Sequence, residues 1–567
     1  GTTNPDPAVG VGNTAKLSVG IVSAYQFYGD GSNITNVGAA ATNSWIPDSQ
    51  SNLVAGTGAG AARDADTYRN LFIGKNAGAL TNSGDDNIFL GEDAGKCNTS
   101  GGKNVFGGMY AGRCMQSGSY NIAFGHGALA GSGTPGNNTG GYNIALGYEP
   151  GCSITSGTQN ILLGGGRPGG SITSGSNNVF LGCYAGGGLT TGSCNIALGN
   201  QAMTNTVTGG NNIAMGWRSG RSLTGGEYNI MFGHCAAASI STGYCNIAIG
   251  SCAGCKVDNH SFNVFLGSSA GRCSEGDYNI AIGCDAGCGM TSGDYGIFLG
   301  QSAGKFVTTG VENIAIGCCA QGTGTVTGQQ NITIGKEAGT DITSGSYNIL
   351  FGRIAARGLT TGQGNIAMGT GTLGGDLATI ATGNNNVMIG NQTASGATSA
   401  ACNVLIGHLA GRCVISATHN IFLGAYAGKC NCTAGKNIAI GNLAMGGAAV
   451  SGSYNVAFGA NAGKCLTSGI SNFFGGYNAG KCNSTGARNT FIGSYAGQDN
   501  LSGKCNVAIG ERVQLPVVSG DSQLAIGNNT NRWIVGNNNF NVGIGTTNPD
   551  PAVGVGNTAK LSVGIVS

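Results

Sequence analysis

Asn246-Ile247-Ala248-Ile249-Gly250 is one of 27 copies of a pentapeptide that recurs along most of this chain. The shared pattern is Asn, apolar, any residue, apolar, Gly, and it runs from Asn70 to a last copy at Gln523. Only the copies that begin at Gly296 and Gln523 have lost the asparagine, and successive copies nearly always begin 17 residues apart. Such a fixed short period predicts a solenoid, in which each repeat covers the apolar face of the one before.

The length and composition of the repeat predict β structure. A helical-hairpin repeat needs about 33 residues or more. Glycine, which disfavours helix by roughly 1 kcal/mol per residue, makes up 110 of the 567 residues. We therefore expect an all-β chain that forms a parallel β-solenoid, or β-roll, of about 27 coils with a 17-residue period. Coils stacked about 4.8 Å apart would give a rod on the order of 130 Å long.

The charge balance excludes several classes of protein. Charged residues are 9% of the chain and the net charge is +2, whereas a nucleic-acid-binding protein should carry a basic stripe. Apolar residues recur at fixed positions, which is not typical of a disordered chain. No apolar run approaches the roughly 20 residues of a membrane span, so we expect no membrane insertion. From the near-neutral charge we likewise expect no binding of nucleic acid.

The extent of the period divides the chain into four segments. We expect a β-rich junction at residues 1–37, a lead-in that caps the solenoid at 38–69, the repeat array at 70–527 and a C-terminal junction at 528–567. Residues 545–567 repeat residues 1–23 letter for letter. This duplication suggests one unit of a longer, tandemly repeated protein. Longer steps after Asn121 and Asn365 predict turns that bulge outwards.

Counting the asparagine as position 1, the alternation of a strand places positions 2 and 4 on one side and position 3 on the other. Positions 2 and 4 are Ile, Val, Leu, Phe or Met almost throughout, and we expect them to form the core of each coil. Position 3 is also apolar, which predicts a second covered face, packed against sister chains in a homo-oligomer. The proposed inter-subunit residues at position 3 include Phe89, Leu162, Phe180, Ala248, Phe265 and Phe422.

The asparagine of position 1 predicts a ladder of carboxamides. In-register amides can hydrogen-bond along a stack of strands, and a plain preference of Asn for turns is the alternative. Representative members of the expected ladder are Asn87, Asn195, Asn246, Asn279, Asn348 and Asn437.

The 21 cysteines follow the repeat. The Cys252-x-x-Cys255 spacing encloses the consensus Ala-Gly of the repeat, so it does not indicate redox or metal chemistry. Several cysteines share position 11 in neighbouring coils, where they would lie within disulfide range by Cα separation. We expect buried apolar thiols there, with disulfides as the alternative. The candidate stacked thiols are Cys97, Cys114, Cys413, Cys430, Cys465 and Cys482.

Catalytic and metal-binding motifs are not found in the sequence. The five histidines show no metal-ligand spacing. Gly267-Ser268-Ser269-Ala270-Gly271 spells GxSxG, but it is again the repeat consensus, and no helix is expected to complete a nucleophile elbow. A polysaccharide lyase built on a β-helix would need clustered charged residues in a groove. We therefore expect no enzyme activity, no cofactor and no metal.

Two resemblances point to an extracellular fibre. Asn541-Val542-Gly543-Ile544-Gly545-Thr546-Thr547-Asn548-Pro549, followed by Ala559-Lys560-Leu561-Ser562-Val563, resembles segments of tail-fibre and related structural proteins of marine phages, cyanophages among them. The array more loosely resembles the β-roll head of trimeric autotransporter adhesins, whose shorter repeats also read Asn-x-Val-Ala-Ile-Gly. The resemblances imply a homotrimer, located in a virion or at a cell surface, and neither family supplies catalytic residues.

These observations favour a structural fibre and adhesion module of a viral tail fibre or similar appendage. Its partners would be further copies of itself, side by side and end to end, and a host or environmental surface receptor that the sequence does not identify. The alternative is a bacterial cell-surface adhesin or a secreted extracellular filament.

Overall fold

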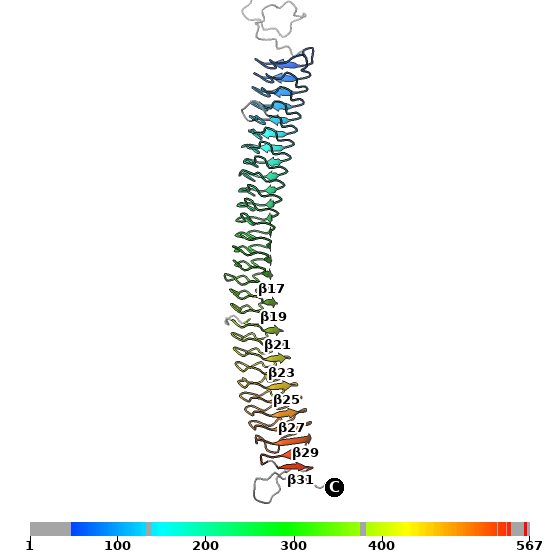
Figure 1. Cartoon of the computed structure of the whole chain (residues 1–567), viewed down its shortest axis with the longest axis vertical. Helices are drawn as coiled ribbons and strands as arrows, with labels where there is room; N and C mark the ends of the chain where they lie inside the picture. The colour runs from blue at the N-terminus through cyan, green and yellow to red at the C-terminus, as the bar shows by residue number, and fades with distance from the viewer. Residues whose placement is uncertain are drawn as a thin grey trace, which may run out of the picture.

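The structure is a computed structural model, which describes residues 47–131, 138–374, 381–529, 531–539 and 541–545, together with the backbone of 561–563. The described part of the chain is all-β and contains no helix. Its strands are stacked one above another in a single elongated rod (Figure 1). The predicted fold class and period are therefore confirmed: the chain is a parallel β-solenoid of about 27 turns with a repeat of about 17 residues.

Most of the strands are three residues long. They are β1 (Leu53–Ala55), β2 (Leu71–Ile73), β3 (Ile88–Leu90), β4 (Val105–Gly107), β5 (Ile122–Phe124), β6 (Ile144–Gly147), β7 (Ile161–Gly164), β8 (Val179–Leu181), β9 (Ile196–Leu198), β10 (Ile213–Met215), β11 (Ile230–Phe232), β12 (Ile247–Ile249), β13 (Val264–Leu266), β14 (Ile280–Ile282), β15 (Ile297–Leu299), β16 (Ile314–Ile316), β17 (Ile332–Ile334), β18 (Ile349–Phe351), β19 (Ile366–Met368), β20 (Val387–Ile389), β21 (Val404–Ile406), β22 (Ile421–Leu423), β23 (Ile438–Ile440), β24 (Val456–Phe458), β25 (Phe473–Gly475), β26 (Thr490–Ile492), β27 (Val507–Ile509), β28 (Leu524–Asn528), β29 (Asn531–Gly536), β30 (Val542–Ile544) and β31 (Leu561–Val563).

Each strand from β1 to β27 pairs in parallel with the next strand of the chain, and the register never slips. In β12 and β13 the partners of Ile247 and Ala248 are Val264 and Phe265. The same register holds where the step between copies changes, because Ile122 still pairs with Ile144 across 22 residues. The turns therefore absorb every change in repeat length, while the strands stay aligned.

The side chains of position 3 lie inside the coil, which corrects the prediction that they form the inter-subunit face. All six residues assigned to that face are at most 1% exposed within a single chain; they are Phe89, Leu162, Phe180, Ala248, Phe265 and Phe422. Positions 2 and 4, predicted to form the core, point outwards instead, as in the 38% exposed Ile249. The reason is parity: the asparagine of position 1 is buried, so position 3, two residues later, faces inwards with it.

The core of each coil is filled by positions 3, 8 and 12, whose sizes compensate. Position 8 is alanine in most coils, as at Ala253. Where position 3 is the small Ala248 or Ala457, position 12 is the larger Val257 or Leu466, and all four are buried. Where position 3 is phenylalanine, position 12 is often small or polar, as at Thr81, Asn98, Ser274, Asn431, Asn483 and Asn500.

Glycine at position 5 lets successive coils approach closely. Gly250 has a φ of +136°, which side-chain-bearing residues rarely adopt, and a Cβ atom there would lie 2.3 Å from the carbonyl oxygen of Gly267 in the next coil. Gly267 meets Gly283 in the same way, at 2.7 Å. A column of glycines at this corner therefore permits the coil spacing.

The solenoid begins one coil earlier than the sequence indicated. Asn52-Leu53-Val54-Ala55-Gly56 fits the repeat pattern, and β1 within it pairs in parallel with β2. The expected lead-in at 38–69 therefore already contains a coil. At the other end β29 and β30 pair antiparallel, so β28 is followed by a hairpin rather than a further coil. The predicted junction at 1–37 and nearly all of the duplicated segment lie outside the described residues.

Candidate surface sites along the rod

The outer face of the parallel sheet is an apolar stripe, which we define as positions 2 and 4 of the repeats. Ile249, Leu181 and Phe351 of position 4 are 38%, 48% and 50% exposed, and Ile349 of position 2 is 41% exposed. The strands that bear the stripe are paired without interruption from β1 to β28, so it extends along the whole array. Monomeric proteins rarely expose contiguous apolar patches above a few hundred Å². The stripe is therefore the strongest candidate for an interaction surface.

Short columns of aromatic rings lie beside the stripe, in runs of coils where the residue before position 1 is tyrosine or phenylalanine. Tyr278 and Tyr295 stack with centroids 5.1 Å apart, and Phe262 stacks on Tyr278 at 4.8 Å. Tyr120 and Tyr142 stack in the same way at 4.7 Å. Because the rings cover one another's faces, each column presents mainly ring edges and hydroxyl groups to solvent. The stacked rings therefore widen the apolar stripe, and few of their faces are free to stack on a ligand.

The asparagines of position 1 tie each coil to its neighbours. Asn246 donates its backbone N–H and its Nδ2 to Oδ1 of Asn229, both at 3.0 Å, and its Nδ2 also donates to the carbonyl of His260 at 2.8 Å. The backbone N–H of each of the six representative asparagines donates to Oδ1 of the preceding asparagine; they are Asn87, Asn195, Asn246, Asn279, Asn348 and Asn437. The buried carboxamides thus satisfy backbone groups as well as one another, and their role is structural.

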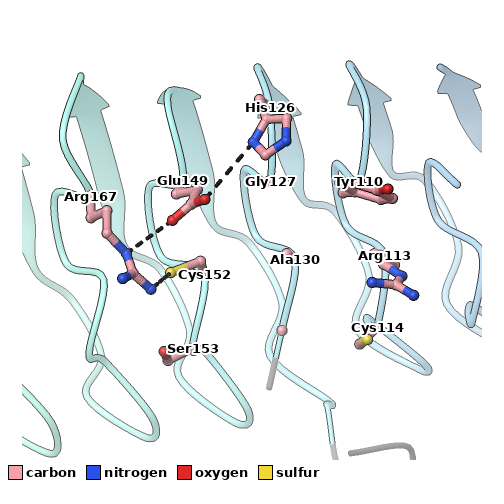
Figure 2. Close-up of a pocket in the computed structure, with 11 residues that line it drawn as sticks. Tyr110, Arg113, Cys114, His126, Gly127, Ala130, Glu149, Cys152, Ser153 and Arg167 are labelled. Carbon is pink, nitrogen blue, oxygen red and sulfur yellow. Dashed lines mark hydrogen bonds and ion pairs between the residues drawn. The ribbon is translucent and has the colours of Figure 1, made fainter. Parts of the chain in front are cut away.

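A cluster of charged side chains borders a hollow of about 360 Å³ on coils β4 to β7 (Figure 2). Glu149 lies between a guanidinium and an imidazole: its Oε2 is 3.1 Å from Nε of Arg167, and its Oε1 is 3.9 Å from Nδ1 of His126. The Cys152 thiol lies 3.1 Å from Nη2 of Arg167. This hydrogen bond is the main cause that raises the pKa of Arg167 above its ordinary value.

The contacts in this hollow do not pair its cysteine with its histidine. A general base is one of the groups that can activate a cysteine nucleophile, but Cys152 contacts the guanidinium of Arg167, while the imidazole of His126 faces Glu149 (Figure 2). The nearby Arg113 lies with its Nε 3.7 Å from Oδ2 of Asp93, which also accepts from Nζ of Lys96 at 3.0 Å. Each of the two carboxylates therefore contacts basic side chains, and Asp93 is shared by two of them. The sequence did not single out this cluster, although its members lie in neighbouring coils.

The six candidate thiols lie in three pairs on consecutive coils, and all the cysteines are unbridged in the structure. Cys97 donates its backbone N–H to the carbonyl of Arg113, the residue before Cys114, at 2.8 Å. Cys114 is buried, whereas the other five are partly exposed. Burial raises the pKa of Cys114, and the charge of Cys97 adds to this effect. Cys252 and Cys255 instead lie in one coil, at positions 7 and 10 of the repeat, and both are partly exposed and unbridged.

Other classes of site are not found in the described residues. They hold no group of three or more His, Cys, Asp or Glu side chains able to ligate a metal ion. None of their secondary structure is a helix long and apolar enough to cross a bilayer. A scan against protein-family models and a search of curated proteins both found no match to this chain. The fold and the apolar stripe therefore carry the functional argument.

Proposed function

We propose that this protein is a structural fibre and adhesion module of a viral tail fibre or a similar extracellular appendage. The main support for this proposal is the uninterrupted stack of in-register strands from β1 to β28, which forms a long rod with one continuous apolar face. A solenoid with a glycine corner and a buried amide ladder is suited to holding its two ends apart.

The rod functions as a homo-oligomer in which the apolar stripe is the subunit interface. Isoleucine, leucine and phenylalanine at positions 2 and 4 are half-exposed in the single chain, and burying them stabilises an assembly by about 25 cal/mol per Å². We expect other copies of the chain to cover the apolar stripe, because a stripe that repeats with the coil matches the same stripe on another copy. A trimer is the proposed assembly, and it rests on the resemblance to autotransporter adhesin heads. The rods join end to end where the duplicated segment occurs.

A bacterial cell-surface adhesin or secreted filament is the second candidate. It is favoured by Asn506-Val507-Ala508-Ile509-Gly510 and its relatives, which loosely resemble the repeat of the autotransporter heads. In either case the rod presents a binding surface for a host or environmental receptor at a distance from its base.

The test is the mass and shape of the full chain in solution. We expect sedimentation equilibrium to give a multiple of the 56.0 kDa chain mass, and negative-stain images to show rods on the order of 130 Å long. A multiple of three supports the trimer, and a multiple of two would keep the fibre but overturn the trimer. A protein that stays monomeric at all concentrations would overturn the proposed assembly.

A further inference from the structure

Three pairs of cysteines occupy the same turn of consecutive coils. Cys413 donates its backbone N–H to the carbonyl of Lys429, the residue before Cys430, at 2.9 Å. Cys465 makes the equivalent bond, also at 2.9 Å, to Lys481, which precedes Cys482. The bond from Cys97 to Arg113, which precedes Cys114, completes the set. Hydrogen bonds at this turn hold the coils of each pair at contact distance and in one register.

This spacing suits a covalent bond between the two sulfur atoms. Neighbouring parallel segments lie about 4.8 Å apart, and disulfides join residues whose Cα atoms are about 4.4–6.8 Å apart. Each of the six cysteines directly follows a lysine or arginine, whose positive charge favours the thiolate and so opposes the burial that raises the pKa of Cys114, Cys430 and Cys482. One member of each pair at least is partly exposed, so a small oxidant can reach it.

We propose that Cys97–Cys114, Cys413–Cys430 and Cys465–Cys482 are oxidation sites that form disulfides between consecutive coils. The oxidant is a small-molecule disulfide such as oxidised glutathione. The thiolate of the more accessible cysteine attacks it, forms a mixed disulfide and releases one small thiolate. The neighbouring thiolate then attacks the protein sulfur of that mixed disulfide, closes the bond between the two Sγ atoms and releases the second. The two protons lost by the cysteines neutralise the released thiolates, and the oxidant gains two electrons.

The positions of the pairs explain what the bonds would do. One pair joins the coils of β3 and β4, and the others join those of β21 to β22 and of β24 to β25, so all three lie towards the ends of the array. Solenoids open repeat by repeat, because each coil contacts only its neighbours. A covalent tie near each end therefore opposes fraying of the outer coils.

Tryptic mapping of the full chain tests the proposal directly. Since a basic residue precedes every one of the six, trypsin separates the members of each pair. The purified protein is incubated with oxidised glutathione while folded, its free thiols are alkylated, and it is then denatured and digested without reductant. We expect peptide 465–481 linked to 482–488 and peptide 413–429 linked to 430–436, while 97–103 joins the fragment that begins at Cys114. Cys432→Ser removes the second thiol of 430–436 and should leave its link intact.

Cys505 is the matched control, because it follows Lys504 and is exposed, but the coils on either side place Arg488 and Ser522 next to it. It should be recovered alkylated, or as a glutathione adduct, in peptide 505–512. Cys465→Ser and Cys114→Ser should each abolish only their own linked peptide; the second variant identifies Cys114, because its tryptic fragment also contains Cys152, Cys183 and Cys194. Full alkylation of all six cysteines after oxidation would overturn the proposal, as would linkage of Cys505 as frequent as linkage within the pairs.

Discussion

Ala248 and Ile249 are neighbours in β12, yet their side chains lie on opposite sides of the coil wall. The methyl group of Ala248 is 1% exposed in the interior, while the side chain of Ile249 is 38% exposed on the apolar stripe. The two residues thus separate folding of the chain from its assembly, and each can be tested alone.

Ala248→Glu should unfold part of the array. The interior offers a carboxylate no partner, and burying an unpaired charge costs several kcal/mol. We expect a lower midpoint of thermal unfolding, measured by circular dichroism. Ile249→Glu should leave the midpoint of the dissociated single chain nearly unchanged, because its carboxylate remains in water there. A folded Ala248→Glu protein with an unchanged midpoint would contradict the inward orientation of position 3.

Ile249→Glu together with Ile282→Glu should weaken the oligomer. Both side chains lie on the apolar stripe, so an assembly would have to bury two charges in every subunit. Sedimentation velocity should show a shift towards the mass of one chain. Ser251→Ala, a change at an exposed residue of the same coil that is off the stripe, is the control and should leave the mass unaltered. If the double variant assembles as tightly as the parent chain, the stripe is not the interface.

Asn246→Ala should destabilise the solenoid. The change removes Oδ1, which accepts from both the backbone N–H and Nδ2 of Asn263, and it removes the donor to the carbonyl of His260. Leaving buried polar groups unsatisfied costs about 1–3 kcal/mol each. Chemical denaturation should show this loss, whereas exposed Gln301→Ala should show almost none. A plain turn preference of Asn would predict a much smaller effect.

Asn483→Leu should stabilise the chain by about 1–3 kcal/mol, because it removes buried polar atoms that have no partner. Asn483 is fully buried, and within the described residues neither its Nδ2 nor its Oδ1 makes a hydrogen bond. Leu189 shows that leucine fits at position 12 of a coil whose position 3 is the phenylalanine Phe180. The reverse change in the preceding coil, Leu466→Asn, is the matched opposite and should lower stability in the same denaturation assay.

The stability contributed by Asp86 should depend on pH. Arg69 donates to its carboxylate at 2.5 Å, and this hydrogen bond lowers the pKa of Asp86 in the folded chain. The stabilisation is therefore present above the unfolded-state pKa and is lost as the pH falls through the lower folded-state value. Thermal melts of Asp86→Asn and the parent chain should differ near neutral pH and converge in acid. A difference that persists in strong acid would exclude the carboxylate as its source.

The sequence was sufficient to predict the solenoid, its period and the place of the repeated strands from β2 to β28, because asparagine and glycine recur at fixed positions. It did not show which side of the strand faces inwards. Positions 2, 3 and 4 are all apolar, so the alternation that normally orients a strand is missing. The larger Ile247 and Ile249 suggested a core that in fact contains Ala248. The correct orientation, with position 3 inside, is indicated by the buried Asn246 and by the compensating sizes of Ala248 and Val257.

The first coil and the surface hollow were missed for different reasons. Asn52-Leu53-Val54-Ala55-Gly56 fits the pattern, but its fourth position is only alanine and no copy precedes it. Glu149 and Arg167 are separated by 18 residues, which a register between coils brings together but local sequence does not. In such a chain the residues at the same repeat position in successive coils are neighbours in space, so contacts are predicted by comparing repeat positions rather than local segments.

Because the register is unbroken, insertion or deletion of whole repeats can change the length of this molecule one coil at a time. Excising residues 246–262 would bring Asn263 beside Asn229, and every contact of the amide ladder and the glycine corner would be restored one coil further along. Unequal recombination between such similar stretches of gene would therefore lengthen or shorten the rod without disturbing its cross-section. The length of the rod can therefore evolve separately from its fold.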